Sequence, residues 1–355
     1  MALFLLCAGM IWAVGWKMAV PRQARWHMIG LLYVVVVALV VVLPEGTALS
    51  RALGGSAATW LVLGALVAIG FGYSLFLQWL KARVRPENLP VDAADPAAPQ
   101  PAKGPLSDGE IERYARHIVL REVGGPGQRS LKDAKVLVIG AGGLGAPALQ
   151  YLAAAGVGTI GVIDDDIVSA SNLQRQVIHS DRTIDMPKVF SAEAAMKGLN
   201  PFIAVRPYNR RFDDTVAQDL VRDYDLVLDG SDNFDTRYRA NAACVAARVP
   251  LIAGAIAQWE GQIGLYDPAR GTPCYACVFP QAPAPGLAPS CAEAGVIGPL
   301  PGVVGSMMAL EAVKHVTGAG RTLKGQLLIF DGLHGETRTM ATAPRHGCPV
   351  CGGAR

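Results

Sequence analysis

Three apolar stretches occupy most of the first 85 residues of this 355-residue chain. Residues 57–80 form the strongest one, with 24 residues and no charge. As a helix this stretch would be about 36 Å long, enough to cross a bilayer. Residues 28–43 are also uncharged but short for a span, and residues 1–16 are apolar. The pattern predicts a membrane anchor of two or three transmembrane helices over residues 1–85. The alternative interpretation of residues 57–80 is a buried helix of a soluble domain.

Beyond these stretches the hydrophobic pattern changes twice. Residues 86–106 contain six prolines among small residues, which is typical of an extended Pro/Ala-rich linker. From residue 107 onward, short apolar runs alternate with helical segments. The expected strands are 135–139, 159–163, 203–207, 226–228, 251–253, 262–266 and 326–330. The expected helices are 107–121, 143–155, 187–198, 214–222, 233–248 and 303–316.

This alternation predicts the fold class of residues 107–355. Ser107 followed by Glu110 matches a capping box, which marks the start of the first helix. Strands that alternate with helices are typical of a sheet with helices on both faces. The sequence therefore predicts a doubly wound α/β sheet.

Charge separates the two regions. The residues before Pro86 carry seven Lys or Arg and one acid, a net charge of +6, whereas the whole chain carries +3. The remainder is therefore net −3, and the basic excess is not a nucleic-acid footprint. Basic clusters lie at residues 17–25 and 81–85, and the loop at 44–56 has only Glu45 and Arg51. The positive-inside rule predicts an inner (cytoplasmic) membrane location with the later domain in the cytoplasm. Residues 1–16 have no basic region before them, so we expect no cleaved signal peptide.

Four of the seven cysteines form two Cys-x-x-Cys pairs. Cys274 pairs with Cys277 and Cys348 with Cys351. Four thiolates in two such pairs fit a tetrahedral site, most simply structural zinc. The competing interpretation is two unrelated pairs of buried thiols. Cys7, Cys244 and Cys291 stand alone, a pattern that favours a reducing compartment over a disulfide framework.

A glycine-rich loop follows the first expected strand. Gly140, Gly142 and Gly145 match the pattern G-x-G-x-x-G, which lets a phosphate approach a helix N-terminus. Asp164 ends the next strand, where a carboxylate can accept ribose hydroxyls. Taken alone, these features indicate an NAD dehydrogenase.

The loops that follow favour a different ligand. Asn172-Leu-Gln-Arg175-Gln supplies amides and a cation, Lys188 starts a helix, and Asp229-Gly-Ser-Asp232-Asn ends a strand. Arg113 and Arg116 lie on the leading helix. Several cations and a metal-ready carboxylate suit a triphosphate with Mg²⁺ better than they suit NAD.

With these motifs in this order, the chain resembles the ThiF/MoeB/HesA family, the bacterial relatives of ubiquitin-activating E1 enzymes. The resemblance runs from about Leu106 to Gly352. It is carried by Arg113-Tyr-Ala-Arg116-His, Gly140-Ala-Gly-Gly-Leu-Gly145, Ser171-Asn-Leu-Gln-Arg-Gln176, Pro187-Lys188, Asp229-Gly-Ser-Asp-Asn233, Cys291-Ala-Glu-Ala-Gly295-Val-Ile-Gly-Pro and both cysteine pairs. It implies a doubly wound, Rossmann-like E1 adenylation fold with a four-cysteine zinc site.

The resemblance also implies roles for individual residues. Gly140, Gly142, Gly143, Gly145, Asp164 and Asn172 would hold ATP. Arg116, Arg175 and Lys188 would contact its phosphates, with Arg116 coming from the second protomer of a homodimer, and Asp232 would bind Mg²⁺. Cys274, Cys277, Cys348 and Cys351 would bind zinc. A catalytic role for Cys291 is open, and His179 and Trp259 are given no role.

The implied activity is ATP-dependent adenylation of the C-terminal glycine of a ubiquitin-like sulfur carrier. The first expectation is a MoaD-like carrier in molybdopterin biosynthesis, and the second is a ThiS-like carrier in thiamine biosynthesis. No rhodanese-like domain follows Cys351, so we expect a separate sulfur donor. The alternatives are an NAD(P)-dependent oxidoreductase and a membrane scaffold with a degenerate nucleotide domain. The complete set of Arg116, Arg175, Lys188 and Asp232 argues against the scaffold.

Overall fold

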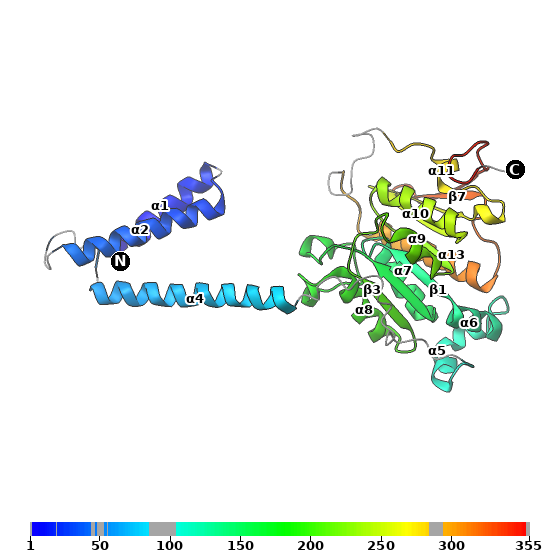
Figure 1. The fold of residues 1–355 in the computed structure, drawn as a ribbon, viewed down its shortest axis with the longest axis horizontal. Helices are drawn as coiled ribbons and strands as arrows, with labels where there is room; N and C mark the ends of the chain where they lie inside the picture. Colours follow the sequence, from blue (N-terminus) through cyan, green and yellow to red (C-terminus); the bar gives the residue numbers. More distant parts are fainter. Residues whose placement is uncertain are drawn as a thin grey trace. The chain divides into compact units, whose positions relative to one another are not determined.

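The computed structural model describes residues 2–18, 20–43, 47, 53–54, 56–84, 104–283 and 294–352. The chain divides into two compact units, Met1–Glu87 and Asn88–Arg355 (Figure 1). Most of the predicted linker lies outside the described residues, so the predicted division into anchor, linker and adenylation domain stays a prediction.

The N-terminal unit consists of long apolar helices. They are α1 (Ala2–Lys17), α2 (Arg22–Val42) and α4 (Ala57–Val84). Two windows are long and apolar enough to cross a membrane, Ala24–Val42 with a mean hydropathy of 2.2 and Ala57–Phe76 with 1.8. Only 11% and 6% of these windows are buried within the protein. The helices therefore expose apolar surface that a soluble core helix would bury.

The second unit is built on one eight-stranded mixed sheet in the order β3-β2-β1-β4-β5-β6-β7-β8. The parallel strands are β1 (Lys135–Ile139), β2 (Thr159–Ile163), β3 (Ala204–Tyr208), β4 (Leu226–Asp229) and β5 (Leu251–Ala257). The antiparallel strands are β6 (Glu260–Tyr266), β7 (Gln326–Asp331) and β8 (Glu336–Ala341). The first five form a parallel half-sheet in the Rossmann-like order 3-2-1-4-5.

The sheet is mixed, and its parallel part ends at β5. Only Gln258 and Trp259 separate β5 from β6, and Gln258 has a φ of 44°. A two-residue connection forms a hairpin, whereas a parallel neighbour needs a crossover of a dozen or more residues. The short loop therefore forces β6 to run antiparallel to β5.

Helices cover both faces of the sheet, and alternate residues of each strand face opposite sides. Val136 and Val138 of β1 belong to the core formed with α7 (Gly145–Ala155), α8 (Lys188–Leu199) and α13 (Pro299–Thr317). Leu137 and Ile139 belong to the opposite core, with α9 (Ala217–Arg222) and α10 (Phe234–Ala247). Because both faces are buried, the strand reads as a continuous apolar run.

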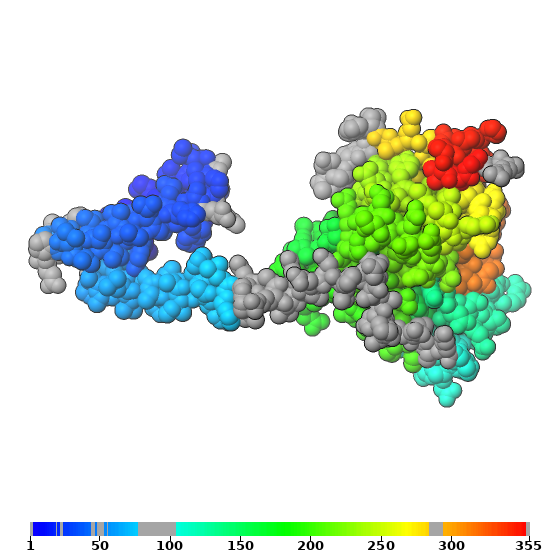
Figure 2. Space-filling view, viewed as in Figure 1, coloured from blue at the N-terminus to red at the C-terminus, as the bar shows by residue number. Residues whose placement is uncertain are grey.

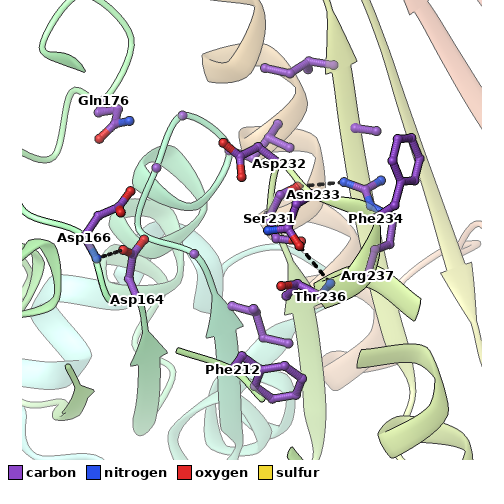
Figure 3. A pocket seen from close by; sticks show the side chains of 18 of the residues that line it. Asp164, Asp166, Gln176, Phe212, Ser231, Asp232, Asn233, Phe234, Thr236 and Arg237 are labelled. Carbon is purple, nitrogen blue, oxygen red and sulfur yellow. Dashed lines mark hydrogen bonds between the residues drawn. The ribbon is translucent and has the colours of Figure 1, made fainter. Parts of the chain in front are cut away.

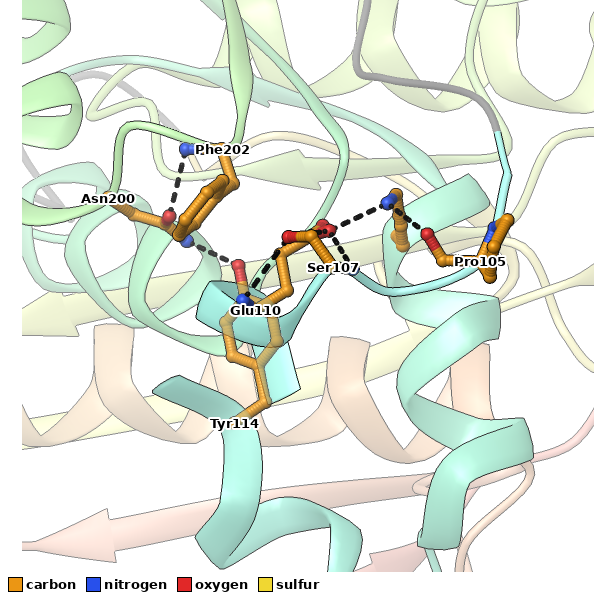
Figure 4. Close-up of polar contacts among 7 residues, drawn as sticks. Pro105, Ser107, Glu110, Tyr114, Asn200 and Phe202 are labelled. Atoms are coloured by element: carbon orange, nitrogen blue, oxygen red, sulfur yellow. Dashed lines mark hydrogen bonds and ion pairs between the residues drawn. The ribbon is translucent and has the colours of Figure 1, made fainter. Parts of the chain in front are cut away.

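A buried polar network joins the two leading helices, α5 (Asp108–Ile118) and α6 (Gly124–Asp133) (Figure 4). The predicted capping box is present, with Ser107 N donating to Glu110 Oε2 at 2.8 Å. Lys132 Nζ donates to the same carboxylate at 2.9 Å and to the Pro105 carbonyl at 3.2 Å. Asn200 Nδ2 donates to the Tyr114 hydroxyl at 2.8 Å. These bonds fix the start of the unit onto its body.

Candidate active site

The glycine-rich loop runs from the end of β1 into α7. Gly140 has a φ of +91°, a left-handed conformation that favours glycine. A Cβ atom on Gly145 would lie 1.8 Å from the Gly140 carbonyl oxygen, so only glycine fits there. Gly140 N donates to the Ile163 carbonyl at 2.9 Å, which ties the loop to β2. The glycines of this loop add no side chain of their own at the N-terminus of α7, which lets a phosphate approach it.

Asp164 fastens this loop from the end of β2. Its Oδ2 accepts a hydrogen bond from Ala141 N at 2.7 Å, and its Oδ1 accepts one from Asp166 N at 2.8 Å (Figure 3). Burial raises the pKa of Asp164, and Lys188 and the two backbone bonds oppose that rise. The carboxylate has further lone pairs that can accept hydrogen bonds from ribose hydroxyls.

A cavity of about 890 Å³ opens above the carboxyl ends of the parallel strands. In Figure 3, Asp164 and Asp166 lie together across from Asp232 and Asn233. The cavity is lined by seven of the residues predicted for the site, namely Gly140, Gly142, Gly143, Asp164, Arg175, Lys188 and Asp232. This is the crevice in which open α/β sheets bind their ligands.

Four cationic residues line the cavity, Arg175, Lys188, Arg211 and Arg237, and the two that were predicted for the site differ in how firmly they are held. The Lys188 side chain is 5% exposed, and its Nζ lies 2.7 Å from Asp166 Oδ2. Lys188 is the first residue of α8, so the helix fixes the position of this charge in the cavity. Arg175 is half-buried, and its Nη1 donates to the Ser171 carbonyl at 3.1 Å. An anion in the cavity would therefore meet positive charge from two loops.

The loop after β4 presents Asp232. Below it, the fully buried Asp229 accepts hydrogen bonds from Ser231 N at 2.9 Å and Ser231 Oγ at 2.6 Å. Arg237 Nε lies 3.7 Å from Asp229 Oδ2, and Arg237 Nη2 donates to the Ser231 carbonyl at 2.8 Å. Asn233 caps α10 by accepting from Thr236 N at 2.9 Å. Asp232 itself is exposed, and within the described chain it has no hydrogen bond or ion pair.

Three predicted residues do not line the cavity of the single chain. Arg116 is exposed on α5, as a residue donated to another protomer would be. Asn172 supports the loop instead, since its carbonyl accepts from Gln176 N at 2.9 Å. Gly145 lies directly beneath Gly140. Cys291 lies outside the described residues.

Sequence reasoning missed two residues that shape the site. The buried His179 places Nε2 2.9 Å from the Ala141 carbonyl and Nδ1 2.9 Å from Ser191 Oγ, linking the glycine loop to α8. Burial lowers the pKa of His179. Arg237 was also overlooked as the partner of Asp229. No local pattern marks either residue, because the His179 contact with Ala141 joins positions 38 apart.

The four predicted zinc ligands lie together. The Sγ–Sγ distances are 3.7 Å for Cys274–Cys277, 3.7 Å for Cys274–Cys348 and 3.4 Å for Cys277–Cys351. All four sulfurs lie within 4.8 Å of one another. Thiolates around tetrahedral zinc at 2.3 Å would be roughly 3.8 Å apart, and a disulfide would need about 2.05 Å. The donor set therefore fits zinc. In Figure 2 the red C-terminal segment lies against a yellow segment that comes earlier in the chain.

Asn241 supports this cluster from α10. Its side chain is 1% exposed, its Nδ2 lies 3.8 Å from Cys274 Sγ, and its Oδ1 accepts from Tyr275 N at 2.9 Å. Such bonds orient ligands and stabilise thiolate charge. The four-cysteine cluster, called the clasp below, thereby joins the C-terminal segment to the helices that border the cavity.

Comparisons with known proteins agree with this geometry. The sequence profile of the ThiF family matches residues 114–350. The SAMP-activating enzyme E1 of Haloferax volcanii is 48% identical over 247 residues, covering 70% of this chain and 91% of that protein. The molybdopterin-synthase adenylyltransferase of Escherichia coli is 46% identical over 247 residues, covering 70% and 98%.

Two further matches show how far the similarity to known proteins extends. The bovine adenylyltransferase and sulfurtransferase MOCS3 is 46% identical over 258 residues, but the match covers only 56% of that protein. Among solved structures, Escherichia coli MccB with ATP superposes with a TM-score of 0.60 at 24% identity, covering 68% of this chain and 74% of that one. At that identity the likeness concerns the fold alone.

Proposed function

Because this chain belongs to the ThiF family, we propose that it adenylates the C-terminal glycine of a small ubiquitin-like sulfur carrier and releases pyrophosphate. Relatives that are 46–47% identical over most of their length are named molybdopterin-synthase adenylyltransferase and sulfur carrier protein adenylyltransferase. The observation that carries the proposal is the convergence of the glycine loop, Lys188, Arg175 and Asp232 on one cavity. The NAD(P)-dependent oxidoreductase gains no support from the relatives described above.

The cavity supplies what the reaction needs. The carrier carboxylate attacks the α-phosphorus of ATP and forms an acyl adenylate, while the bond to the pyrophosphate oxygen breaks. The nucleophile is already ionised at neutral pH, so no strong general base is required. The barrier is the approach of one anion to another, and Lys188 and Arg175 lower it electrostatically. Asp232 would hold Mg²⁺, which supplies further positive charge at the phosphates.

Other residues take supporting roles in the proposal. The exposed position of Arg116 supports its donation to the cavity of a second protomer in a homodimer. The four cysteines would bind zinc, and because all four positions are protein ligands the zinc would be structural. Asp164 would accept the ribose hydroxyls while holding the loop.

A MoaD-like carrier in molybdopterin biosynthesis is the first choice, because a relative with that activity in its name matches over 98% of its length. A ThiS-like carrier remains the second choice. We further propose that sulfur comes from a separate donor protein. The long apolar helices and the basic residues of the N-terminal unit support a location at the inner membrane, with the adenylation unit in the cytoplasm.

The test is ATP–pyrophosphate exchange by the full-length protein in detergent. Each candidate carrier is added intact or lacking its C-terminal glycine. We expect exchange that depends on the intact carrier, and an acyl-adenylate on the carrier by mass spectrometry. Absence of exchange with every carrier, together with saturable NAD(P)H binding, would overturn the proposal.

A further inference from the structure

The N-terminal unit contains a buried cation, Arg25, that forms no ion pair with any residue the structure describes. Arg25, in the first turn of α2, is 8% exposed, and its buried Nε has no hydrogen-bond partner. Residues 1–85 hold a single carboxylate, Glu45, which lies outside the described residues. A buried charge without a partner is costly, so such groups usually mark a ligand or partner.

The packing around Arg25 is specific. Its guanidinium lies 4.8 Å from the centre of the Trp12 ring, a cation–π distance. Trp12 in turn packs edge-to-face against Trp26 at 5.2 Å. A Cβ atom on Gly15 would lie 2.8 Å from both Cγ and Cδ of Arg25. The glycine therefore leaves room for the arginine stem to cross α1.

This arrangement borders a cavity of about 500 Å³ lined by Trp12, Ala13, Trp16 and Arg25. Trp16 is 76% exposed, and Lys17, which is exposed next to it, adds a second cation. The cavity thus combines indole walls with a guanidinium whose Nε has no hydrogen-bond partner. A guanidinium fork suits phosphate oxygens, and the first turn of a helix favours negative charge.

We propose that this corner of α1 and α2 binds the phosphate group of an anionic phospholipid. The inference goes beyond adenylation, and it rests on the membrane location proposed above. Indole rings favour the headgroup level of a bilayer, and basic clusters on the cytoplasmic side attract anionic lipids. The phosphate pairs with Arg25 while the headgroup lies against Trp12 and Trp16. The site gives the anchor a preference for lipid charge that its apolar helices cannot provide.

The experiment measures lipid retention, which is independent of catalysis. Full-length protein in a nonionic detergent is mixed with equal amounts of phosphatidylglycerol and phosphatidylcholine of matched chains. Native mass spectrometry then counts the bound lipid. We expect phosphatidylglycerol to be retained preferentially, and Arg25→Gln to weaken its binding by roughly tenfold, the value of one charge-assisted hydrogen bond.

Matched variants separate geometry from charge. Gly15→Ala keeps the charge but displaces the Arg25 stem, so it should weaken phosphatidylglycerol binding like Arg25→Gln. Gly9→Ala lies on the same helix with nothing within 4 Å of the added Cβ and should have no effect. Lys17→Gln removes one charge outside the cavity lining and should change binding less than Arg25→Gln. Size-exclusion profiles and helical content check folding.

Three results would overturn the assignment. The first is equal retention of the two lipids. The second is an unchanged preference in both Arg25→Gln and Gly15→Ala with native helical content. The third is displacement of the lipid by millimolar inorganic phosphate, which would make this a site for free phosphate. Failure of carrier adenylation leaves these readouts unaffected.

Discussion

The chemistry of the site depends on a few side chains that the fold leaves unengaged. Asp164, Asp229 and Lys188 are held by hydrogen bonds or ion pairs within the protein. Asp232 lines the same cavity and is engaged by none of the described residues. A carboxylate that contributes nothing to local packing is available to a metal or ligand.

We therefore predict that Asp232→Asn leaves the fold intact and lowers carrier-dependent pyrophosphate exchange by roughly 100-fold or more, the scale of losing an electrostatic contact in a transition state. The measurement is exchange rate together with thermal unfolding. Asp235→Asn is the control, because Asp235 is also exposed in the same segment but does not line the cavity. Near-normal exchange in a folded Asp232→Asn would remove this role.

At this scale the sequence predicts residues whose motif is local. The glycine loop, Lys188 and the two cysteine pairs are each recognisable within a few positions. In the structure Gly140, Gly142, Gly143 and Lys188 line one cavity, and the four cysteines lie together. His179 and Arg237 could not be found in this way. Each acts through a contact with a distant segment, His179 with Ala141 and Arg237 with Gly254.

Among the elements, the prediction succeeded where burial dominates the pattern. The first two strands match at both ends, since their residues are apolar and packed on both faces. The missed strand β8 has the sequence Glu-Thr-Arg-Thr-Met-Ala, and all six residues are exposed. Its order comes from backbone pairing with β7, which leaves no hydrophobic signal. The helix α6 begins with Gly-Gly-Pro-Gly, which reads as a turn.

The junction of α5 and α6 depends on one buried ion pair. Glu110 and Lys132 are each 6% exposed and lie 2.9 Å apart. Burial alone would raise the pKa of Glu110, but hydrogen bonds from Lys132 and Ser107 outweigh burial and lower it. Ionised Glu110 therefore stabilises the fold at neutral pH.

We predict that Glu110→Gln lowers the free energy of unfolding by about 3 kcal/mol at pH 7, because Lys132 keeps a buried charge without its partner. The pKa of Glu110 is lower in the folded state than in the unfolded state. The stability that its ionised form contributes is therefore fully present above the unfolded-state pKa, about 4.3, and is lost as pH falls through the folded-state pKa. The difference in the free energy of unfolding between wild type and variant should therefore become smaller below about pH 4. Thermal melts from pH 7 to pH 3 measure this, and Glu112→Gln, at an exposed position of the same helix, is the control. A gap that stays constant with pH would contradict the assignment.

At the scale of the whole molecule, the four-cysteine cluster proposed to bind zinc closes a long loop. Cys274 and Cys348 are 74 positions apart, and the segment between them includes α13 and β7. Metal binding at such a site is coupled to folding. The clasp should therefore stabilise the second half of the sheet.

Cys348→Ser should release the metal and lower the melting temperature by roughly 10 °C, which corresponds to about 3 kcal/mol in a protein of this size. Metal analysis and thermal unfolding of the purified protein measure both effects. Cys244→Ala removes a buried thiol outside the cluster and should keep one zinc per chain. If Cys348→Ser also keeps one zinc and melts normally, the four-cysteine site is wrong.

The two units of the chain carry different features and are expected to have separate functions. The apolar helices and the excess positive charge belong to residues 1–85. Every residue proposed for ATP, Mg²⁺ or zinc lies at or after Arg116. A truncated chain should begin at Gly104, because the Pro105 carbonyl accepts a hydrogen bond from Lys132 and Ser107 caps α5.

We predict that this truncated chain is soluble and dimeric, binds one zinc and adenylates its carrier at a rate within about twofold of the full chain. The reason is that a chain starting at Gly104 keeps the hydrogen bonds of Pro105 and Ser107, and truncation is tolerated when no buried backbone bond is lost. Sedimentation, metal content and pyrophosphate exchange measure these properties, with the full chain in detergent as control. The N-terminal unit would then set where the enzyme works and how much carrier it meets, rather than the chemistry. A truncated chain that keeps its fold and zinc but has lost adenylation would make the membrane unit part of the catalytic machinery.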